Sequence, residues 1–141
     1  MGKEQADAYG WRLIDALREA DFGEFFAVLQ VFFAGIPYDI QLSQERYYQT
    51  VFYLIFKLLG LQVGVEVRTH RGRIDAVVAL AEGVFVFEFK VGGTAEAALA
   101  QIAARGYVEP YRQGGKPVYA IGVVFGREER GIVDWQVVET A

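Results

Sequence analysis

Three charged residues lie inside two apolar stretches that otherwise have the composition of buried β-strands. Asp75 lies in RIDAVVAL (residues 73–80), and Glu88 and Lys90 lie in VFVFEFKV (residues 84–91). Carboxylates are rarely buried alone, because a charge removed from water must be paired, hydrogen-bonded or bound to a metal. Two carboxylates and a lysine are also the groups that metal-assisted phosphodiester hydrolysis requires, since they supply oxygen ligands for Mg²⁺ or Mn²⁺ and a cation beside the reacting water. The pattern therefore indicates a candidate site.

The turn between the two stretches decides how these residues meet. Ala81-Glu82-Gly83 predicts a hairpin. A two-residue loop at Glu82-Gly83 would place Asp75 opposite Lys90, whereas a four-residue loop would place it opposite Glu88. Either loop puts the three charged residues on one face, because strand side chains alternate, and an odd-length loop without a bulge would separate them. The apolar residues expected on the other face are Ile74, Ala76, Val78, Phe85, Phe87 and Phe89.

Considered alone, the hairpin leaves two interpretations open. The charged residues could form a site, or Asp75 and Lys90 could form a structural salt bridge with Glu88 on a solvated face. A basic cluster just before Asp75 has the same ambiguity. Arg68, His70, Arg71 and Arg73 could contact phosphate, although so short a cluster is more often a solvated loop.

The composition predicts one folded domain of 141 residues, since 53% of them are hydrophobic and only three are proline. The chain has no cysteine, which excludes disulfides and thiolate metal sites and is typical of the reducing cytoplasm. The longest apolar run, residues 51–65, contains Lys57 and Gln62 and is too short to span a bilayer, so no membrane partner is expected. A net charge of −4 disfavours a general nucleic-acid-binding surface.

Apolar periodicity and cap residues predict the order of helices and strands. The expected helices are 4–20, 23–34, 44–59 and 95–105, and the expected strands are 62–69, 73–80, 84–91, 117–125 and 134–139. Ser43 and Thr94 are suitable N-caps, and Gly106 is a suitable end for helix 95–105. Because that helix connects two strands as a crossover, those strands are expected to be parallel. The predicted fold is α/β, with helix 44–59 on one side of a mixed sheet and helix 95–105 on the other.

The pattern Asp75…Glu88-Phe89-Lys90 resembles the PD-(D/E)XK nuclease superfamily. Two further features support the resemblance: Glu45 on the helix before the first core strand, and Gln101-Ile102…Gly106-Tyr107 after the lysine strand. More narrowly, roughly residues 43–139 resemble the nuclease-like domain at the C-terminus of bacterial and archaeal AAA-ATPase-like proteins, and residues 10–40 resemble its helical lead-in. The chain has no GxxxxGK[ST] motif, so an ATPase partner domain would lie outside it.

The resemblance implies a restriction-endonuclease-like α-β-β-β-α-β core over residues 43–141, with residues 1–42 as an N-terminal helical extension packed with it as one unit. It also implies Mg²⁺- or Mn²⁺-dependent hydrolysis of phosphodiester bonds, with DNA as the expected substrate. Asp75, Glu88 and the main-chain carbonyl of Phe89 would bind the metal. Lys90 would position the attacking water, and Glu45 would support a second metal or hold Lys90.

By the same resemblance, Gln101, Tyr107 and Arg73 would support the site or contact the substrate. Simpler interpretations exist for several of these residues. Glu45 could favour the helix dipole near a helix start, and Gln101 and Tyr107 could only hydrogen-bond across a helix–sheet contact. His70, the sole histidine, lacks the partner ligands of a metal site. Aromatic side chains serve more often in packing than in base stacking, which is the expectation for Trp11 and Trp135.

Two alternatives to a nuclease remain at this stage. One is a catalytically silent module that keeps the nuclease fold for interaction or regulation and is normally linked to an ATPase. The other is a protein that self-associates, for example as a homodimer, through residues 4–34, whose phenylalanine side chains could leave an exposed apolar patch.

Overall fold

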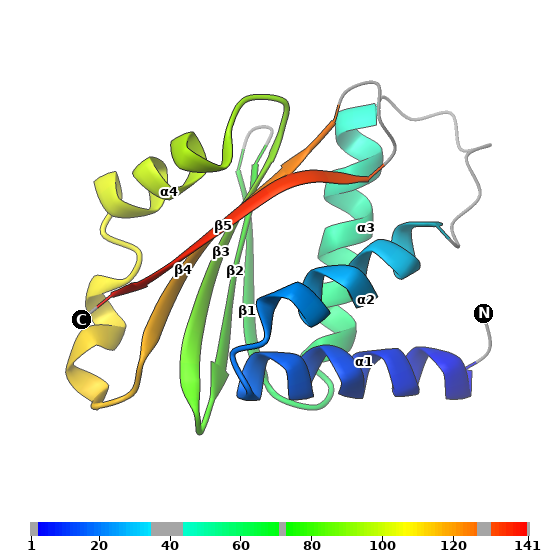
Figure 1. Ribbon diagram of the computed structural model, residues 1–141, viewed down its shortest axis with the longest axis horizontal. Coiled ribbons are helices and arrows are strands. Elements are labelled where there is room, and N and C mark those ends of the chain that lie inside the picture. The colour runs from blue at the N-terminus through cyan, green and yellow to red at the C-terminus, as the bar shows by residue number, and fades with distance from the viewer. Residues whose placement is uncertain (1–2, 35–43, 71–72, 127–130, 141) are drawn as a thin grey trace.

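The chain forms a five-stranded sheet with helices on both faces, as a computed structural model shows for residues 3–34, 44–70, 73–126 and 131–140 (Figure 1). Its elements, in chain order, are α1 (Lys3–Arg18), α2 (Phe22–Ala34), α3 (Gln44–Leu59), β1 (Gly64–His70), β2 (Arg73–Leu80), β3 (Gly83–Val91), α4 (Ala95–Ala104), the 3₁₀ helix η1 (Glu109–Gly114), β4 (Val118–Phe125) and β5 (Ile132–Thr140). No described helix is long and apolar enough to cross a membrane.

The strands follow one another across the sheet in the order β1-β2-β3-β4-β5. Strands β3 and β4 are parallel and the other three pairs are antiparallel. The parallel pair is the one that α4 connects, because a crossover must return the chain to the end of the sheet where it began. The predicted α/β class, mixed sheet and parallel pair are confirmed, and the arrangement is that of a restriction-endonuclease-like fold.

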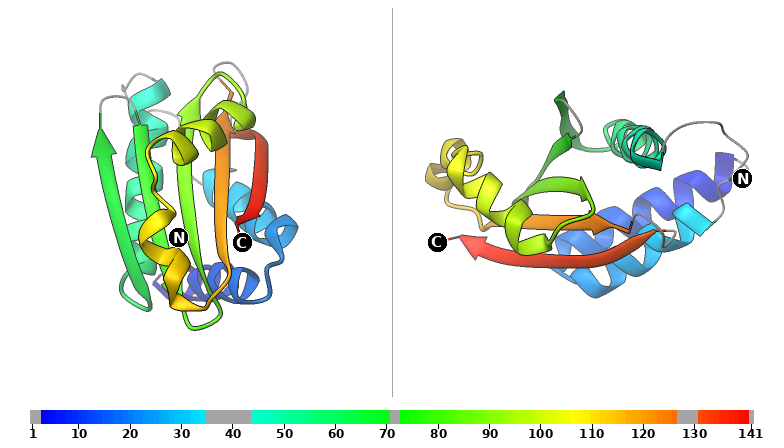
Figure 2. Two further views of the ribbon diagram at one scale, coloured as in Figure 1. Left: turned by 90° about the vertical axis from the view of Figure 1, so that its left-hand side faces the viewer. Right: turned by 90° about the horizontal axis from the view of Figure 1, so that it is seen from above.

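Helices cover the two faces of the sheet unequally. Helices α1, α2 and α3 pack on one face in a single large apolar cluster, and α4 packs on the other face in a smaller one (Figure 2). All six apolar residues that the alternation predicts for one face of the hairpin belong to the larger cluster. Within it, Phe89 stacks on Phe52 of α3 at 3.9 Å between ring centroids, and Phe87 lies 5.5 Å from Phe25 of α2.

The register of the β2–β3 hairpin differs from the first of the two predicted alternatives. Leu80 pairs with Gly83, so the two-residue loop is Ala81-Glu82, one residue earlier than expected. Gly83 belongs to β3, and its neighbour Val84 donates a backbone hydrogen bond to the Pro117 carbonyl (2.9 Å), just before β4. Asp75 therefore lies opposite Glu88 instead of Lys90. The prediction that all three side chains share a face is unaffected, because the register moves by an even number of residues.

Element boundaries depart from prediction where backbone hydrogen bonds form turns. Helix α1 ends at Arg18 instead of residue 20, because Ala20 adopts a left-handed conformation (φ 52°) and the Asp21 amide donates to the Ala16 carbonyl. Strand β1 begins at Gly64 instead of residue 62, since the Gln62 amide still bonds to α3. The helix η1 was not predicted, and Ser43 lies outside the described residues.

A single close approach positions α4 on the sheet. A Cβ atom added to Gly122 of β4 would lie 2.6 Å from the Ala95 carbonyl oxygen and 3.0 Å from the Ala98 Cβ. The N-terminus of α4 is fixed as predicted, because the Thr94 hydroxyl accepts a hydrogen bond from the Ala97 amide at 3.1 Å. Glycine at position 122 thus allows α4 to lie directly against β4.

We expect Gly122→Ala to destabilise the protein by about 2 kcal/mol, because the new methyl group must push α4 away from the sheet. Urea unfolding of the variant would measure the loss. Gly114→Ala is the matched control, since a Cβ at Gly114 would meet nothing within 4 Å. Equal stability of the two variants would show that α4 does not depend on this contact.

A carboxylate pair beneath helix α4

Asp75 and Glu88 face each other across the two central antiparallel strands, on the side of the sheet that α4 covers. The exposed fraction is 5% for Asp75 and 0% for Glu88, and these are the buried charged residues among the described side chains. Strands β2 and β3 bury them because the surrounding positions are apolar. Opposite residues on neighbouring strands have Cβ atoms roughly 5 Å apart, so the two carboxyl groups can share one cation.

Helix α4 and the segment after it supply the groups that contact Glu88. The side-chain amide of Gln101 satisfies both of its polar atoms in one of its two orientations. In that orientation its nitrogen donates to Glu88 Oε1 at 2.9 Å and its oxygen accepts from Lys90 Nζ at 3.2 Å. Arg105 Nη1 donates to the same Glu88 oxygen at 3.2 Å. The arrangement follows from helical periodicity, because Gln101 and Arg105 are one turn apart on the same face.

Tyr107 lies at the outer edge of this cluster. Its hydroxyl accepts a hydrogen bond from Arg105 Nη1 at 3.4 Å. Two guanidinium groups lie near its ring, with the Cζ of Arg68 at 5.5 Å and that of Arg105 at 5.9 Å from the centroid. The structure thus brings together five of the residues that the sequence singles out for a role, namely Asp75, Glu88, Lys90, Gln101 and Tyr107.

Two of the predicted site residues have side chains outside the described part of the chain. The backbone of Glu45 lies in the first turn of α3, one turn before Gln49, which lines a small cavity together with Lys90. The backbone of Arg73 begins β2. The side chain of His70, which was expected to be a loop residue, is also outside the described set, although its backbone ends β1.

Sequence reasoning missed Arg105. The signal was present, because Arg105 follows Gln101 by four residues on a predicted helix and must lie on the same face. Arg68 lies in β1, as the predicted strand 62–69 implies, but its position directly opposite Asp75 was not predicted. Trp11 and Trp135 are partly exposed, and Trp135 stacks on Phe26 of α2 at 4.5 Å between ring centroids, which is a packing contact.

Burial is the main reason why the pKa of Glu88 is raised from 4.5 to about 7. The charge of Asp75 raises it further, whereas Lys90 lowers it. A buried carboxyl group next to a second one is costly to ionise without added positive charge. A divalent cation bound between Asp75 and Glu88 would therefore lower the energetic cost of ionising both carboxyl groups.

The donor set fits a hard divalent cation. Asp75, Glu88 and the carbonyl of Phe89 offer oxygen atoms, which Mg²⁺ and Mn²⁺ prefer. Among the side chains that the structure describes, no group of three or more histidine, aspartate or glutamate residues is placed so that it could hold a metal ion. Such an ion would therefore depend on two side-chain carboxylates, main-chain oxygen and water, as Mg²⁺ commonly does.

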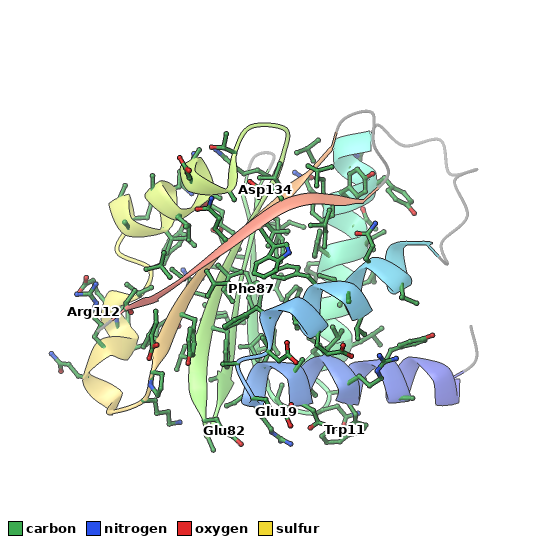
Figure 3. The ribbon with its side chains drawn as sticks, in the orientation of Figure 1. Trp11, Glu19, Glu82, Phe87, Arg112 and Asp134 are labelled. Atoms are coloured by element: carbon green, nitrogen blue, oxygen red, sulfur yellow. The ribbon has the colours of Figure 1, made fainter. Side chains whose placement is uncertain are left out.

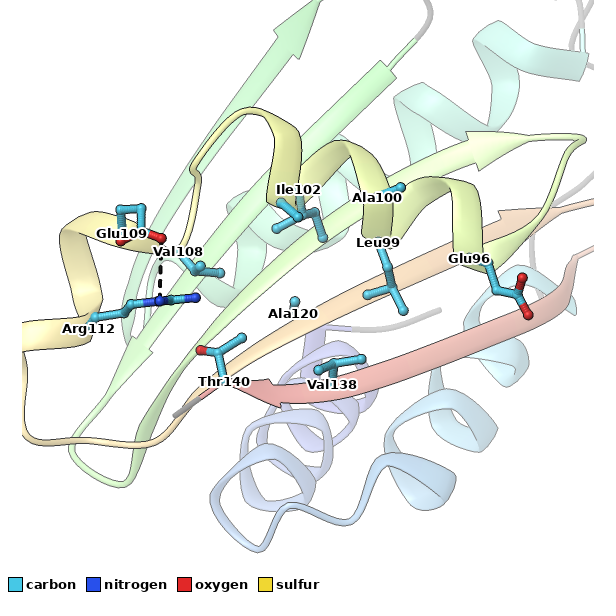
Figure 4. A pocket seen from close by; sticks show the side chains of 11 residues that line it. Glu96, Leu99, Ala100, Ile102, Val108, Glu109, Arg112, Ala120, Val138 and Thr140 are labelled. Atoms are coloured by element: carbon cyan, nitrogen blue, oxygen red, sulfur yellow. Dashed lines mark ion pairs between the residues drawn. The ribbon is translucent and has the colours of Figure 1, made fainter.

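A second hollow of about 420 Å³ lies between α4, η1, β4 and β5 (Figure 4). Its lining is mainly apolar, with the Glu109–Arg112 ion pair (3.5 Å) at one end. Neither Asp75 nor Glu88 lines it, so the chemistry-bearing residues belong to the other side of α4.

The sheet order and the carboxylate pair define the class of protein. The sequence model of the PD-(D/E)XK nuclease superfamily matches residues 43–135, and the chain belongs to this superfamily. A curated relative, an uncharacterized protein in the vnfD 5′ region of Azotobacter chroococcum mcd 1, is 39% identical over 133 residues. The match covers 89% of this chain and 26% of that protein, so the chain spans about a quarter of the relative's length. No solved structure matches the chain.

Membership has two general consequences. Nucleases of this superfamily generally use divalent metal ions, and their fold serves to act on nucleic acid. The matched region contains both carboxylates, Lys90, Gln101 and Tyr107, so it coincides with the cluster that the geometry identifies.

We expect the metal-free protein, kept in a chelator, to lose stability as the pH rises from about 4.5 to 7. In this window the folded state retains a proton on Glu88 that the unfolded state has released, so ionisation favours unfolding. One pKa unit corresponds to about 1.4 kcal/mol, which makes the loss a few kcal/mol. Thermal unfolding across this range measures it, with Glu88→Gln as the comparison. A stability difference between the two proteins that stays constant with pH would contradict the expectation.

Proposed function

We propose that this chain is a metal-dependent nuclease that hydrolyses phosphodiester bonds in DNA. One observation carries the proposal: Asp75 and Glu88 lie opposite each other and buried, with Lys90 two residues along the same strand and linked to Glu88 through Gln101. A purely structural core would be at least as stable with apolar residues at such positions. The superfamily match supports the same function.

In this proposal Asp75, Glu88 and the Phe89 carbonyl hold Mg²⁺ or Mn²⁺. When bound, the ion supplies Lewis-acid polarisation of the phosphate and lowers the pKa of a coordinated water. Lys90 orients the attacking water and donates to the negative charge that grows on the phosphate oxygens. Gln101 fixes the positions of Lys90 and Glu88 relative to each other by hydrogen bonding to both.

Three further roles extend the proposal to the surroundings of the carboxylates. Glu45 supports a second metal ion or holds Lys90, and its place one turn before Gln49 on α3 supports this. Tyr107 and Arg73 contact the substrate backbone. Tyr107 lies at the outer edge of the cluster, and Arg73 lies two residues before Asp75 on the same strand.

We also propose that residues 1–42 are a helical extension packed with residues 43–141 as one unit. Buried residues of α1 and α2, such as Leu17 and Phe25, share one apolar cluster with α3 and the sheet, which supports it. An ATPase domain joined to this unit and a homodimeric state are further parts of the proposal. The much greater length of the Azotobacter relative leaves room for another domain.

The alternative function is a catalytically silent module that uses the nuclease fold for interaction or regulation. Its supporting observation is the set of bonds around Glu88, which Arg105 and Gln101 both contact. Such bonds satisfy a buried carboxylate without any ion. In that case Mn²⁺ should neither bind nor change the stability of the protein.

We expect the protein to cleave DNA with Mg²⁺ or Mn²⁺, and Asp75→Asn, Glu88→Gln and Lys90→Ala each to lower the rate by at least about 100-fold, as the loss of a catalytic charge does. Cleavage of supercoiled plasmid and of labelled oligonucleotides provides the measurement. A chelator should abolish cleavage by the wild type.

The matched control is Glu82→Gln, at the tip of the same hairpin (Figure 3), where the side chain is exposed and lies 3.7 Å from Arg18. It removes the same charge from the loop that joins the two strands and should leave the rate unchanged. Calorimetric titration with Mn²⁺ separates the two functions, because the silent module binds no ion. If neither metal binding nor cleavage of any nucleic acid is found with folded protein, the nuclease proposal is wrong.

A further inference from the structure

Two arginines flank the carboxylate pair from opposite sides. Arg68 of β1 pairs with Asp75, which pairs with Glu88, so the three residues form one row across the sheet. Partners in a row point to the same face, which directs Arg68 towards the α4 side. Arg105 approaches Glu88 from the end of α4.

The aromatic ring of Tyr107 lies near both guanidinium groups. Their Cζ atoms are 5.5 and 5.9 Å from its centroid, within the range of a cation–π contact. Both arginine side chains are partly exposed, at 43% for Arg68 and 32% for Arg105. Two like charges are thus held near one ring at the solvent-facing edge of a buried acidic pair.

Among the described residues, the formal charges around the pair balance in the absence of a metal. The described residues that pair, bond or contact within this cluster include three acids, Glu66, Asp75 and Glu88, and three bases, Arg68, Lys90 and Arg105. Formally their total is zero. With a divalent cation between Asp75 and Glu88 the total rises by two, and Glu88 no longer needs Arg105 as its counter-charge. The edge of the site then favours an anion.

We infer that Arg68 and Arg105, held by Tyr107, form a clamp for the phosphodiester backbone of the DNA substrate next to the scissile bond. The inference rests on the proposed function and extends it from the metal ligands to the substrate. Guanidinium groups bind phosphate oxygens in a bidentate manner. The clamp explains how a chain with a net charge of −4 can hold a polyanion, since a local positive edge forms when the metal is bound.

The test is the salt dependence of DNA binding. A labelled DNA duplex with phosphorothioate linkages keeps the backbone charge and resists hydrolysis, and it is titrated with protein in Mn²⁺ at several salt concentrations by fluorescence anisotropy. Each phosphate contact contributes about 0.9 to the slope of log K against log salt concentration. Arg68→Gln and Arg105→Gln should each reduce the slope by about one and weaken binding to unrelated sequences equally.

Arg12→Gln is the matched control, because it removes an exposed arginine that pairs with Glu24 (2.9 Å) on the helices covering the other face. It should keep the wild-type slope. Arg105→Lys keeps the charge and should keep the slope, so that a reduced slope in Arg105→Gln reports the lost charge. Arg68→Gln removes a partly exposed side chain and makes the test independent of whether Arg105→Gln folds. If Arg68→Gln, and Arg105→Gln where it folds, have the Arg12→Gln slope while the wild type cleaves DNA, the clamp is wrong and the nuclease function stands. If the wild type neither binds nor cleaves DNA, both are wrong.

Discussion

Two carboxyl groups facing each other inside a sheet covered on both sides are the constraint on which the rest of the structure depends. Asp75 and Glu88 cannot move apart, because β2 and β3 are paired on both sides of them, from Ile74–Phe89 to Leu80–Gly83. Their side chains are also almost fully shielded from solvent, and groups at the end of α4 contact Glu88. Their negative charge must therefore be compensated locally. Lys90, on the same strand as Glu88, and Arg105, at the end of α4, supply the positive charge.

The position of α4 is set by contacts that are themselves uncharged. Its buried residues Ala95, Ala98 and Ile102 lie against the sheet, and Gly122 allows the closest approach. Small residues on both sides bring the helix axis near β4. As a result Gln101 and Arg105, one turn apart, reach over to β3 and meet Glu88. The hydrogen bonds of the cluster are thus a consequence of apolar packing.

Most of the fold could be predicted from the sequence, because α3, β2, β3 and β4 have strong apolar patterns and α4 has clear end signals in Thr94 and Gly106. The shared face of Asp75, Glu88 and Lys90 followed from alternation alone. The exact partner of Asp75 did not, because it depends on whether Gly83 lies in the turn or pairs with Leu80, and the sequence permits both. The spacing from Gln101 shows that Arg105 shares its helix face, but the contact of Arg105 with Glu88 depends on how α4 packs on the sheet, which no local pattern contains.

The two faces of α4 also carry different consequences for evolutionary change. Ala95, Ala98 and Ile102 hold the helix in the fold, whereas Gln101 and Arg105 contribute little apolar burial and act on Glu88. Mutational drift on the second face can therefore remove chemistry while the domain keeps its shape, provided that Glu88 is replaced together with its partners. Descendants of such a domain could retain the sheet and helices as a binding platform, so membership of the superfamily and nuclease activity are separable traits.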